Sequence, residues 1–407
     1  MRGILLLSCP IYALSLSWVP VGTPTQRDYI LASACAFSDA GDALQALGTG
    51  ASATDPSTTT LVQQLRGGAW ETVESHRPQF PQPYEHFSLR ARGGNFYVGL
   101  TINPSDSAAA GLSSILRSVQ PGGGEDGMEG AYAFASTAWA YDVASDGSAR
   151  AAMASSDNQT LGLTAYPASG WDAYPAGNAW TPLQRVAAPA GGVAAVTAAR
   201  GEGALFVAYA EGASAQVEVG ATPLNASSQA WQALGAPFGG AGLARQRVPP
   251  ALAWGSSAGR GAGGVLCAAA HSARVGEVLF ACARMHGNGT AAGSWAPPEP
   301  ALQGAAPGLA PGLALIPTAS GGLRLAIAAA GSSSLVSAAC ELPAQGPPAC
   351  LPAALPALRF AGAPVTDFDL CAPAPAQARS SAVPLLLVVA AGPADGTGDS
   401  LVAMTLQ

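Results

Sequence analysis

The chain has 407 residues and a net charge of −7, and only 11% of its residues are charged, compared with about 25% in an average soluble domain. All 18 basic residues are arginine, and no run of them forms the basic footprint that nucleic-acid binding requires. The 50 glycines and 33 prolines separate short apolar runs, which predicts many turns between strands rather than disorder. We therefore expect an all-β protein with no nucleic-acid partner.

The first 21 residues have the pattern of a signal peptide. Met1 and Arg2 form a charged start, an apolar stretch follows from Ile4 to about Val21, and Ser15–Ser17 is a candidate cleavage site. A single membrane anchor is the alternative, because the stretch approaches spanning length. Its proline and serines favour the signal peptide, which predicts a secreted protein without stable membrane insertion. Three acceptor sequons in predicted turns also favour export: Asn158, Asn225 and Asn288.

After the leader, the chain repeats one pattern of short apolar runs separated by turns. Residues 192–234 show it most clearly, with four runs divided by Gly-containing turns at 200–203 and 211–214. Four such runs in succession predict an antiparallel meander of the size of one propeller blade. In chain order we expect seven four-stranded blades at approximately residues 25–75, 84–128, 131–185, 191–236, 249–298, 311–357 and 364–407.

The seventh unit provides only three strands, Val365–Leu370, Val383–Ala391 and Ser400–Leu406. An open ring would leave an unpaired sheet edge at this point. The residues after the leader, about Val21–Arg27, precede the inner strand of the first unit. We predict that they form a strand that closes the last blade, so that residues 22–407 make a single β-propeller domain.

A Gly-rich segment and four tryptophans help to place strands in the predicted units. The third unit is predicted to begin with a long strand over Tyr132–Val143, because the second unit loses its pattern in the Gly-rich segment Gly122–Gly130. Four closing strands are each predicted at a tryptophan: Trp70, Trp180, Trp231 and Trp295. Large aromatics usually fill the layers between sheets, so we interpret these tryptophans as packing, with ligand stacking as the alternative.

Six cysteines remain once Cys9 of the leader is set aside, and an even number in an exported chain predicts disulfides. The blade assignment predicts three pairs: Cys35–Cys371, Cys267–Cys282 and Cys340–Cys350. The last two pairs lie on neighbouring strands of one unit. The first pair lies at the ends of the inner strands of the first and last units, which are neighbours across the ring closure.

The sequence contains no motif that identifies a catalytic, metal or cofactor site. The four histidines have no metal-ligand spacing, and no phosphate loop, dinucleotide fingerprint or G-x-S-x-G motif occurs. We expect no metal and no cofactor. A propeller glycosidase would need paired carboxylates at the centre of the ring, and the candidates near inner strands are Asp28, Asp142, Asp367 and Asp369. We interpret them as structural or solvated carboxylates, with catalysis by the last three as the alternative.

A closing pattern of the form x-Trp-x-x-Leu follows three of the predicted meanders, at Ala69–Val73 (with valine in the last place), Ala179–Leu183 and Ala230–Leu234. A meander with this ending resembles the repeats of β-propeller lectins, including the fungal fucose-binding type. The resemblance implies a protein that binds sugar between blades with recurring Arg, Glu and aromatic side chains. Arg284 stands alone on its strand in the fifth unit, so the resemblance assigns no sugar-binding residue.

Three functions remain open on this evidence. We favour a secreted, non-catalytic binding propeller that recognises a glycan or an extracellular protein partner. The alternatives are a secreted propeller glycoside hydrolase that uses central carboxylates, and a cell-wall or matrix scaffold.

Overall fold

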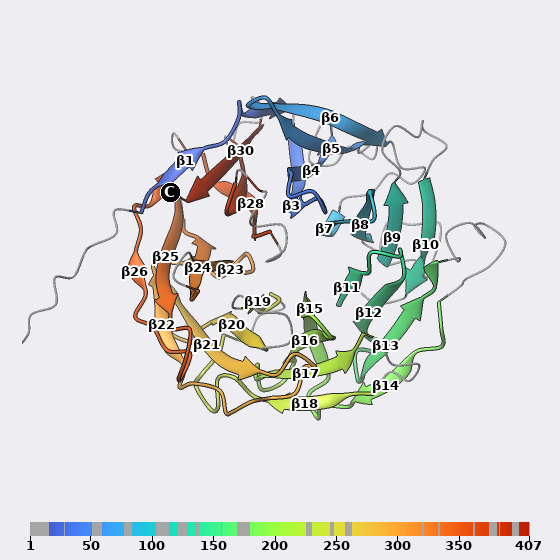
Figure 1. The fold of residues 1–407 in the computed structure, drawn as a ribbon, viewed down its shortest axis with the longest axis vertical. Helices are drawn as coiled ribbons and strands as arrows, with labels where there is room; N and C mark the ends of the chain where they lie inside the picture. Colours follow the sequence, from blue (N-terminus) through green and yellow to red (C-terminus); the bar gives the residue numbers. More distant parts are fainter. Residues whose placement is uncertain are drawn as a thin grey trace, which may run out of the picture.

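The computed structural model shows an all-β protein whose sheets stand around a central axis (Figure 1). It describes residues 16–27, 29–50, 59–76, 84–102, 114–119, 128–134, 138–155, 157–168, 180–224, 230–244, 248–256, 263–318, 321–332, 334–360, 363–373, 381, 383–392 and 399–406. In these residues, thirty strands form seven antiparallel sheets, and there is no α-helix. The architecture is the seven-bladed β-propeller that the sequence predicts. No helix in the described segments could cross a membrane.

Each of the first three blades is a four-stranded meander whose first strand lies nearest the axis (Figure 1). Blade 1 contains β3 (Tyr29–Phe37), β4 (Ala43–Gly50), β5 (Thr59–Arg66) and β6 (Ala69–His76). Blade 2 contains β7 (Tyr84–Arg92), β8 (Asn95–Ile102), β9 (Ser114–Val119) and β10 (Met128–Phe134). Blade 3 contains β11 (Trp139–Val143), β12 (Ala149–Ala154), β13 (Leu161–Tyr166) and β14 (Gln184–Ala187).

The next three blades repeat the same meander. Blade 4 contains β15 (Val193–Arg200), β16 (Ala204–Glu211), β17 (Val217–Pro223) and β18 (Gln232–Gly235). Blade 5 contains β19 (Ala251–Ser256), β20 (Gly264–His271), β21 (Glu277–Met285) and β22 (Glu299–Gln303). Blade 6 contains β23 (Gly312–Pro317), β24 (Leu323–Ala330), β25 (Ser334–Leu342) and two short rim strands, β26 (Ala353–Ala354) and β27 (Leu358–Arg359), which both pair with β25.

The seventh blade joins the two ends of the chain. It contains β28 (Val365–Cys371), β29 (Leu386–Ala391), β30 (Asp399–Leu406) and, at the rim, β1 (Trp18–Pro20) and β2 (Thr25–Arg27). Both N-terminal strands pair antiparallel with β30. The predicted closure of the ring by an N-terminal strand is therefore confirmed.

The structure places β1 at Trp18–Pro20, ahead of residue 22, where the propeller was predicted to start. Trp18 is buried, pairs with Leu406, and donates a hydrogen bond from Nε1 to Oγ of Ser337 in blade 6 (2.8 Å). Burial in the last blade therefore also accounts for the apolar residues Trp18 and Val21.

The boundary between blades 2 and 3 also differs from the prediction. The predicted strand Tyr132–Val143 is two strands in two blades: β10 pairs with β9, and β11 pairs with β12. Blade 3 therefore begins at Trp139, and not at residue 131. The sequence from Tyr132 to Val143 contains no Gly or Pro that would mark the change of blade.

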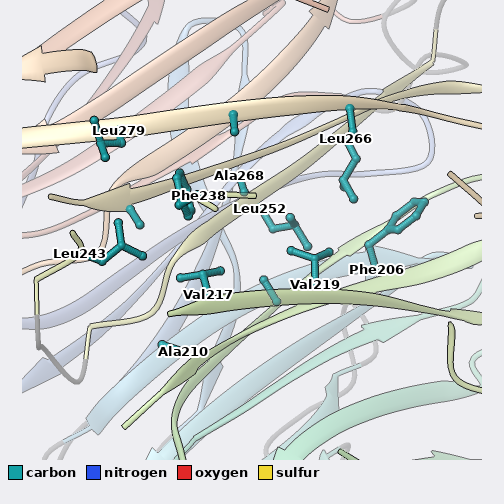
Figure 2. Close-up of a cluster of buried hydrophobic side chains, with 14 of the residues drawn as sticks. Phe206, Ala210, Val217, Val219, Phe238, Leu243, Leu252, Leu266, Ala268 and Leu279 are labelled. Atoms are coloured by element: carbon teal, nitrogen blue, oxygen red, sulfur yellow. The ribbon is translucent and has the colours of Figure 1, made fainter. Parts of the chain in front are cut away.

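The apolar core is divided into layers between neighbouring blades. Every residue of β20 is buried, as is every residue of β16 except Glu211. Because these second strands are covered on both faces, they read as unbroken apolar runs and not as an alternating pattern. Figure 2 shows the layer between blades 4 and 5, which includes Phe206 and Val219 of blade 4 and Leu252 and Leu266 of blade 5.

Three disulfides join the cysteines in the pairs that the blade assignment predicts: Cys35–Cys371, Cys267–Cys282 and Cys340–Cys350. The first joins the inner strands of blades 1 and 7, with Cα atoms 6.0 Å apart and 336 residues between them in sequence. The other two lie within one blade each and span 15 and 10 residues. Only the first therefore ties the ring closed.

Candidate functional site

A cavity of about 810 Å³ lies on the axis of the ring, lined by the inner strands of all seven blades. Its charged lining residues lie on β7, β11, β15 and β28: Arg90, Arg92, Asp142, Arg200, Asp367 and Asp369. The neighbouring inner strands β19 and β23 contribute small and apolar side chains, such as Leu252 and Leu313. The cavity therefore has a charged wall and an apolar wall.

Asp142 is a buried carboxylate held by two arginines. It lies on β11 between Tyr141 and Val143, which pack against Tyr97 of blade 2. Successive strand side chains point to opposite faces, so Asp142 faces blade 4. Nη1 of Arg200 in blade 4 lies 2.5 Å from Oδ2 of Asp142. Nε of Arg90 in blade 2 lies 3.8 Å from Oδ1 of Asp142. Asp142 is only 5% exposed, so it is a buried, ion-paired carboxylate rather than a solvated one.

The ring of Tyr141 supports Arg90. The Tyr141 hydroxyl donates to the carbonyl oxygen of Tyr97 (3.0 Å) and lies 3.2 Å from that of Ser88, both in blade 2. Burial raises the pKa of Tyr141 to about 12, so the phenol remains a donor at neutral pH. The guanidinium carbon of Arg90 lies 5.6 Å from the ring centroid, which is within range of a cation–π interaction.

Arg92 completes a group that we call the channel arginines: Arg90, Arg92 and Arg200. Arg92 is the last residue of β7, and its Nη1 donates to the carbonyl oxygen of Ala91 (2.8 Å). Burial lowers the pKa of Arg92, and the positive charges of Arg200 and Arg90 lower it further, whereas Asp142 and Asp39 raise it. Within the described segments Arg92 forms no salt bridge. It is a cation on the cavity wall without a contacting carboxylate.

Asp367 and Asp369 are half-buried in the cavity wall, and their side chains hold the closure of the ring. Oδ2 of Asp367 accepts hydrogen bonds from N and Oγ of Ser33 (2.6 and 3.2 Å), and Oδ2 of Asp369 accepts from N of Cys35 (3.0 Å). Ser33 and Cys35 lie on β3 of blade 1. Side chains of blade 7 therefore bind the backbone of blade 1, next to the Cys35–Cys371 disulfide.

A third carboxylate acts in the same way. Asp399, at the start of β30, is buried, and its Oδ2 accepts a hydrogen bond from N of Ile30 on β3 (2.7 Å). Backbone N–H groups that face a neighbouring blade would otherwise lack a partner, which is costly in a buried position. We call Asp367, Asp369 and Asp399 the seam carboxylates.

The seam predicts a pH dependence of stability. Burial raises the pKa of Asp367 from 3.8 to about 7, the negative charge of Asp369 raises it further, and the bonds from Ser33 lower it. The folded protein therefore binds an extra proton between about pH 4 and 7, so its free energy of unfolding should fall as the pH rises through this window. We expect Asp367→Asn to remove about 2 kcal/mol of that fall, measured by urea unfolding at pH 4 to 8.

Burial also raises the pKa of Asp369. In the Asp367→Asn variant, the fall of the unfolding free energy with rising pH should therefore be smaller but should not disappear. Glu299→Gln, at an exposed carboxylate on β22, is the control and should keep the slope of the parent. If the unfolding free energy of Asp367→Asn depended on pH as strongly as that of the parent, Asp367 would not be the group responsible for the pH dependence.

The four predicted tryptophans lie outside the cavity and pack within and between blades. Nε1 of Trp70 donates to the carbonyl oxygen of Val21 at the rim of blade 7 (3.0 Å), and Nε1 of Trp295 donates to that of Leu234 at the rim of blade 4 (2.9 Å). Each indole therefore binds the outer edge of the preceding blade. The other two pack within their own blades: Trp180 is buried against Tyr166 in blade 3, and Trp231 packs over Gly220 in blade 4.

Two of the closing strands begin later than predicted. β14 begins four residues after Trp180, and β22 begins four residues after Trp295. Prolines follow both tryptophans, at Pro182 and at Pro297 and Pro298. Proline has no backbone N–H to donate to a sheet ladder, so pairing starts beyond these prolines.

Two of the predicted glycosylation sites can be located. Asn158 and Asn288 are exposed in the turns after β12 and β21, where a glycan could project into solvent. Their glycosylation stays a prediction. Asn225 and the carboxylate candidate Asp28 lie outside the described residues.

The channel arginines were not recognised from the sequence, where Arg200 was assigned to the turn at 200–203. Arg92 and Arg200 instead occupy the same place in two blades, as the last residue of the inner strand, immediately before a glycine. The recurring signal was therefore present in Arg92-Gly93 and Arg200-Gly201. It becomes visible only when the units are aligned on their inner strands.

No family model and no curated protein matches the sequence. The polysaccharide lyase Uly1 has a similar solved structure, with a TM-score of 0.53 and 7% identity, over 89% of this chain and 88% of that chain. AofleA from Arthrobotrys oligospora gives a TM-score of 0.48 at 10% identity, over 85% and 94% of the two chains. The Aleuria aurantia lectin AAL, solved with Fucα1-6GlcNAc, gives 0.43 at 12%, over 84% and 100%.

The fold places this chain in the class of β-propeller proteins. Solved propellers that resemble it include lectins and enzymes. Identities of 7 to 12% show the fold alone, so its function must be argued from its own site.

Proposed function

We propose that the protein is a secreted, non-catalytic binding propeller that holds a glycan in its central cavity. The observation that supports the proposal most is the cavity itself, whose 810 Å³ falls within the range of about 300–1,000 Å³ for ligand sites. Its charged wall can donate and accept hydrogen bonds, while its apolar wall can contact the less polar faces of sugar rings.

Three observations support export to an oxidising compartment. The N-terminal residues have a charged start and an apolar stretch. Three disulfides are present, and disulfides persist mainly in secreted proteins. The two sequons that can be located are exposed in turns. Together they support an extracellular binding protein.

A non-catalytic role is supported by what the acidic side chains of the cavity do. A glycosidase needs two carboxyl groups free to act on opposite sides of the scissile bond. Asp142 is held by Arg200, and Asp367 and Asp369 hold the backbone of β3. Their structural contacts favour binding over hydrolysis.

Hydrolysis is the second candidate, because a carboxyl group with a pKa of about 7, such as Asp367, can serve as a general acid. We expect Asp367→Asn to leave glycan binding unchanged. If it instead abolished a measurable polysaccharide hydrolysis in a folded protein, the glycoside hydrolase would take first place.

Glycan-array screening of the secreted protein tests the proposal. We expect binding to at least one glycan class, and a loss of tenfold or more in Thr366→Trp, because Thr366 is an exposed residue of β28 that lines the cavity. Thr72→Trp, at an exposed residue of β6, is the matched control and should bind like the parent.

The other outcomes separate the alternatives. A folded parent that binds no glycan would favour the matrix scaffold. Binding that is equal in parent and Thr366→Trp would place the ligand outside the cavity and overturn the proposed site.

A further inference from the structure

The channel arginines outnumber the carboxylates that they contact. Arg200 and Arg90 share one carboxylate, that of Asp142, and Arg92 contacts none in the described part of the chain. Three guanidinium groups that line one cavity therefore have a single direct counter-ion.

The other carboxylates nearby are engaged in the fold. Asp39 accepts from N of Gly93 (2.5 Å) in the turn after β7, and Asp146 accepts from N and Oγ of Ser148 (2.9 and 2.7 Å) in the turn after β11. Asp369 holds Cys35 across the seam. These contacts keep the three carboxylates in place, and among the described residues none of them forms a salt bridge with Arg92.

Most donors of the channel arginines remain available. Arg90 and Arg92 each use Nη1 to bind the carbonyl oxygen of the preceding residue, and Arg200 uses Nη1 for Asp142 and Val143. Their other guanidinium N–H groups donate no hydrogen bond to a described residue. An arginine carries five N–H donors in a planar fork that matches the oxygens of a carboxylate or sulfate.

We propose that Arg90, Arg92 and Arg200 form a subsite for the anionic group of an acidic saccharide, a uronate carboxylate or a sulfate ester. The inference rests on the proposed function, since it names the chemical class of the ligand in the same cavity. A saccharide fits better than a free anion because the cavity is much larger than one anionic group. The part of its wall formed by β19 and β23 is mainly apolar and includes the half-buried Trp254. The Trp254 ring stacks on Phe206, and a sugar ring could contact its exposed part.

Calorimetric titration with matched probes tests the inference. The probes are an oligogalacturonate, its neutral methyl ester and a sulfated galactan oligosaccharide. We expect at least one anionic probe to bind tenfold or more tightly than the neutral ester, and to bind less tightly as the salt concentration rises. Arg92→Gln should abolish this preference, because it removes one cation without breaking a salt bridge. Arg66→Gln, at an exposed arginine on β5, is the control and should retain it.

Asp142→Asn provides a second variant with the opposite expectation. It removes the counter-ion of Arg200, so the anionic probe should bind more tightly provided that the thermal midpoint stays near that of the parent. If neither anionic probe binds, or if the methyl ester binds as well as the acid in both parent and Arg92→Gln, the anionic subsite is overturned. Binding of neutral glycans on the array would still support the proposed function in that case.

Two further probes decide the source of the anion. Inorganic sulfate should compete only weakly with the oligosaccharide, and equal affinity for the two would reduce the site to a small-anion site. A poly-glutamate peptide should also bind weakly, because it lacks sugar rings to contact the apolar wall. A peptide that binds as tightly as the saccharide would overturn the saccharide assignment in favour of an acidic protein partner.

Discussion

Loss of the seam disulfide should lower the free energy of unfolding by up to about 5 kcal/mol, more than loss of either local pair. The Cys35–Cys371 bond spans 336 residues, whereas Cys340–Cys350 spans 10. In the chain-entropy account a cross-link stabilises by restricting the unfolded chain, and the effect grows with the length of the closed loop. We expect a loss of about 3 kcal/mol or less for the local pair. Calorimetric unfolding without reductant measures both.

Double variants provide the matched comparison, because they leave no unpaired thiol. Cys35→Ser with Cys371→Ser should unfold at a clearly lower temperature than Cys340→Ser with Cys350→Ser. Non-reducing peptide mapping of the parent should also recover a peptide that contains Cys35 linked to Cys371. A free Cys35, or an equal loss of stability in the two double variants, would contradict the role of this bond.

Arg200→Ala should destabilise the protein by about 3 kcal/mol, because it leaves the buried carboxylate of Asp142 with Arg90 as its remaining cation, 3.8 Å away. Most of the cost comes from the uncompensated charge of Asp142, so Asp142→Leu in the same chain should restore much of the stability. Urea unfolding of the two single variants and the double variant gives the coupling energy.

An exposed ion pair supplies the comparison. Arg324 pairs with Glu341 on the surface of blade 6 at 2.7 Å, and such pairs contribute about 0–1 kcal/mol. If Arg324→Ala lowers the free energy of unfolding as much as Arg200→Ala does, then the burial of Asp142 does not determine the strength of the Arg200–Asp142 ion pair.

Most of the architecture could be predicted because most inner and second strands are apolar and most turns contain a marker residue. The predicted strands Val365–Leu370 and Ser400–Leu406 each lie within one residue of the observed bounds of β28 and β30. Prediction failed where those markers were absent, as between β10 and β11. It was ambiguous where an apolar segment had two explanations, as at Trp18, which fits both a leader and a buried strand.

The candidate site was predicted less well than the fold. Asp142, Asp367 and Asp369 were identified as residues near inner strands, but their partners are brought together only by the closed ring. Arg200 is 58 residues from Asp142, and Ser33 is 334 residues from Asp367. No local pattern in the sequence reveals such contacts, so the sequence did not distinguish structural from solvated carboxylates.

The seam between blades 7 and 1 also sets the order of events during biosynthesis. The chain is made from its N-terminus, and blades 1 to 6 consist of consecutive segments that can form as they emerge. β1 and β2 cannot pair until β30, which ends at Leu406, has been synthesised. The N–H groups of β3 likewise have no seam carboxylates to bind until β28 and β30 are present. Until then the ring is an open arc with an exposed sheet edge, which is prone to wrong pairing. A chain that stops before residue 399 lacks β30, so β1 and β2 have no strand to pair with and the last blade keeps an exposed edge, even where Cys371 is present to bond Cys35.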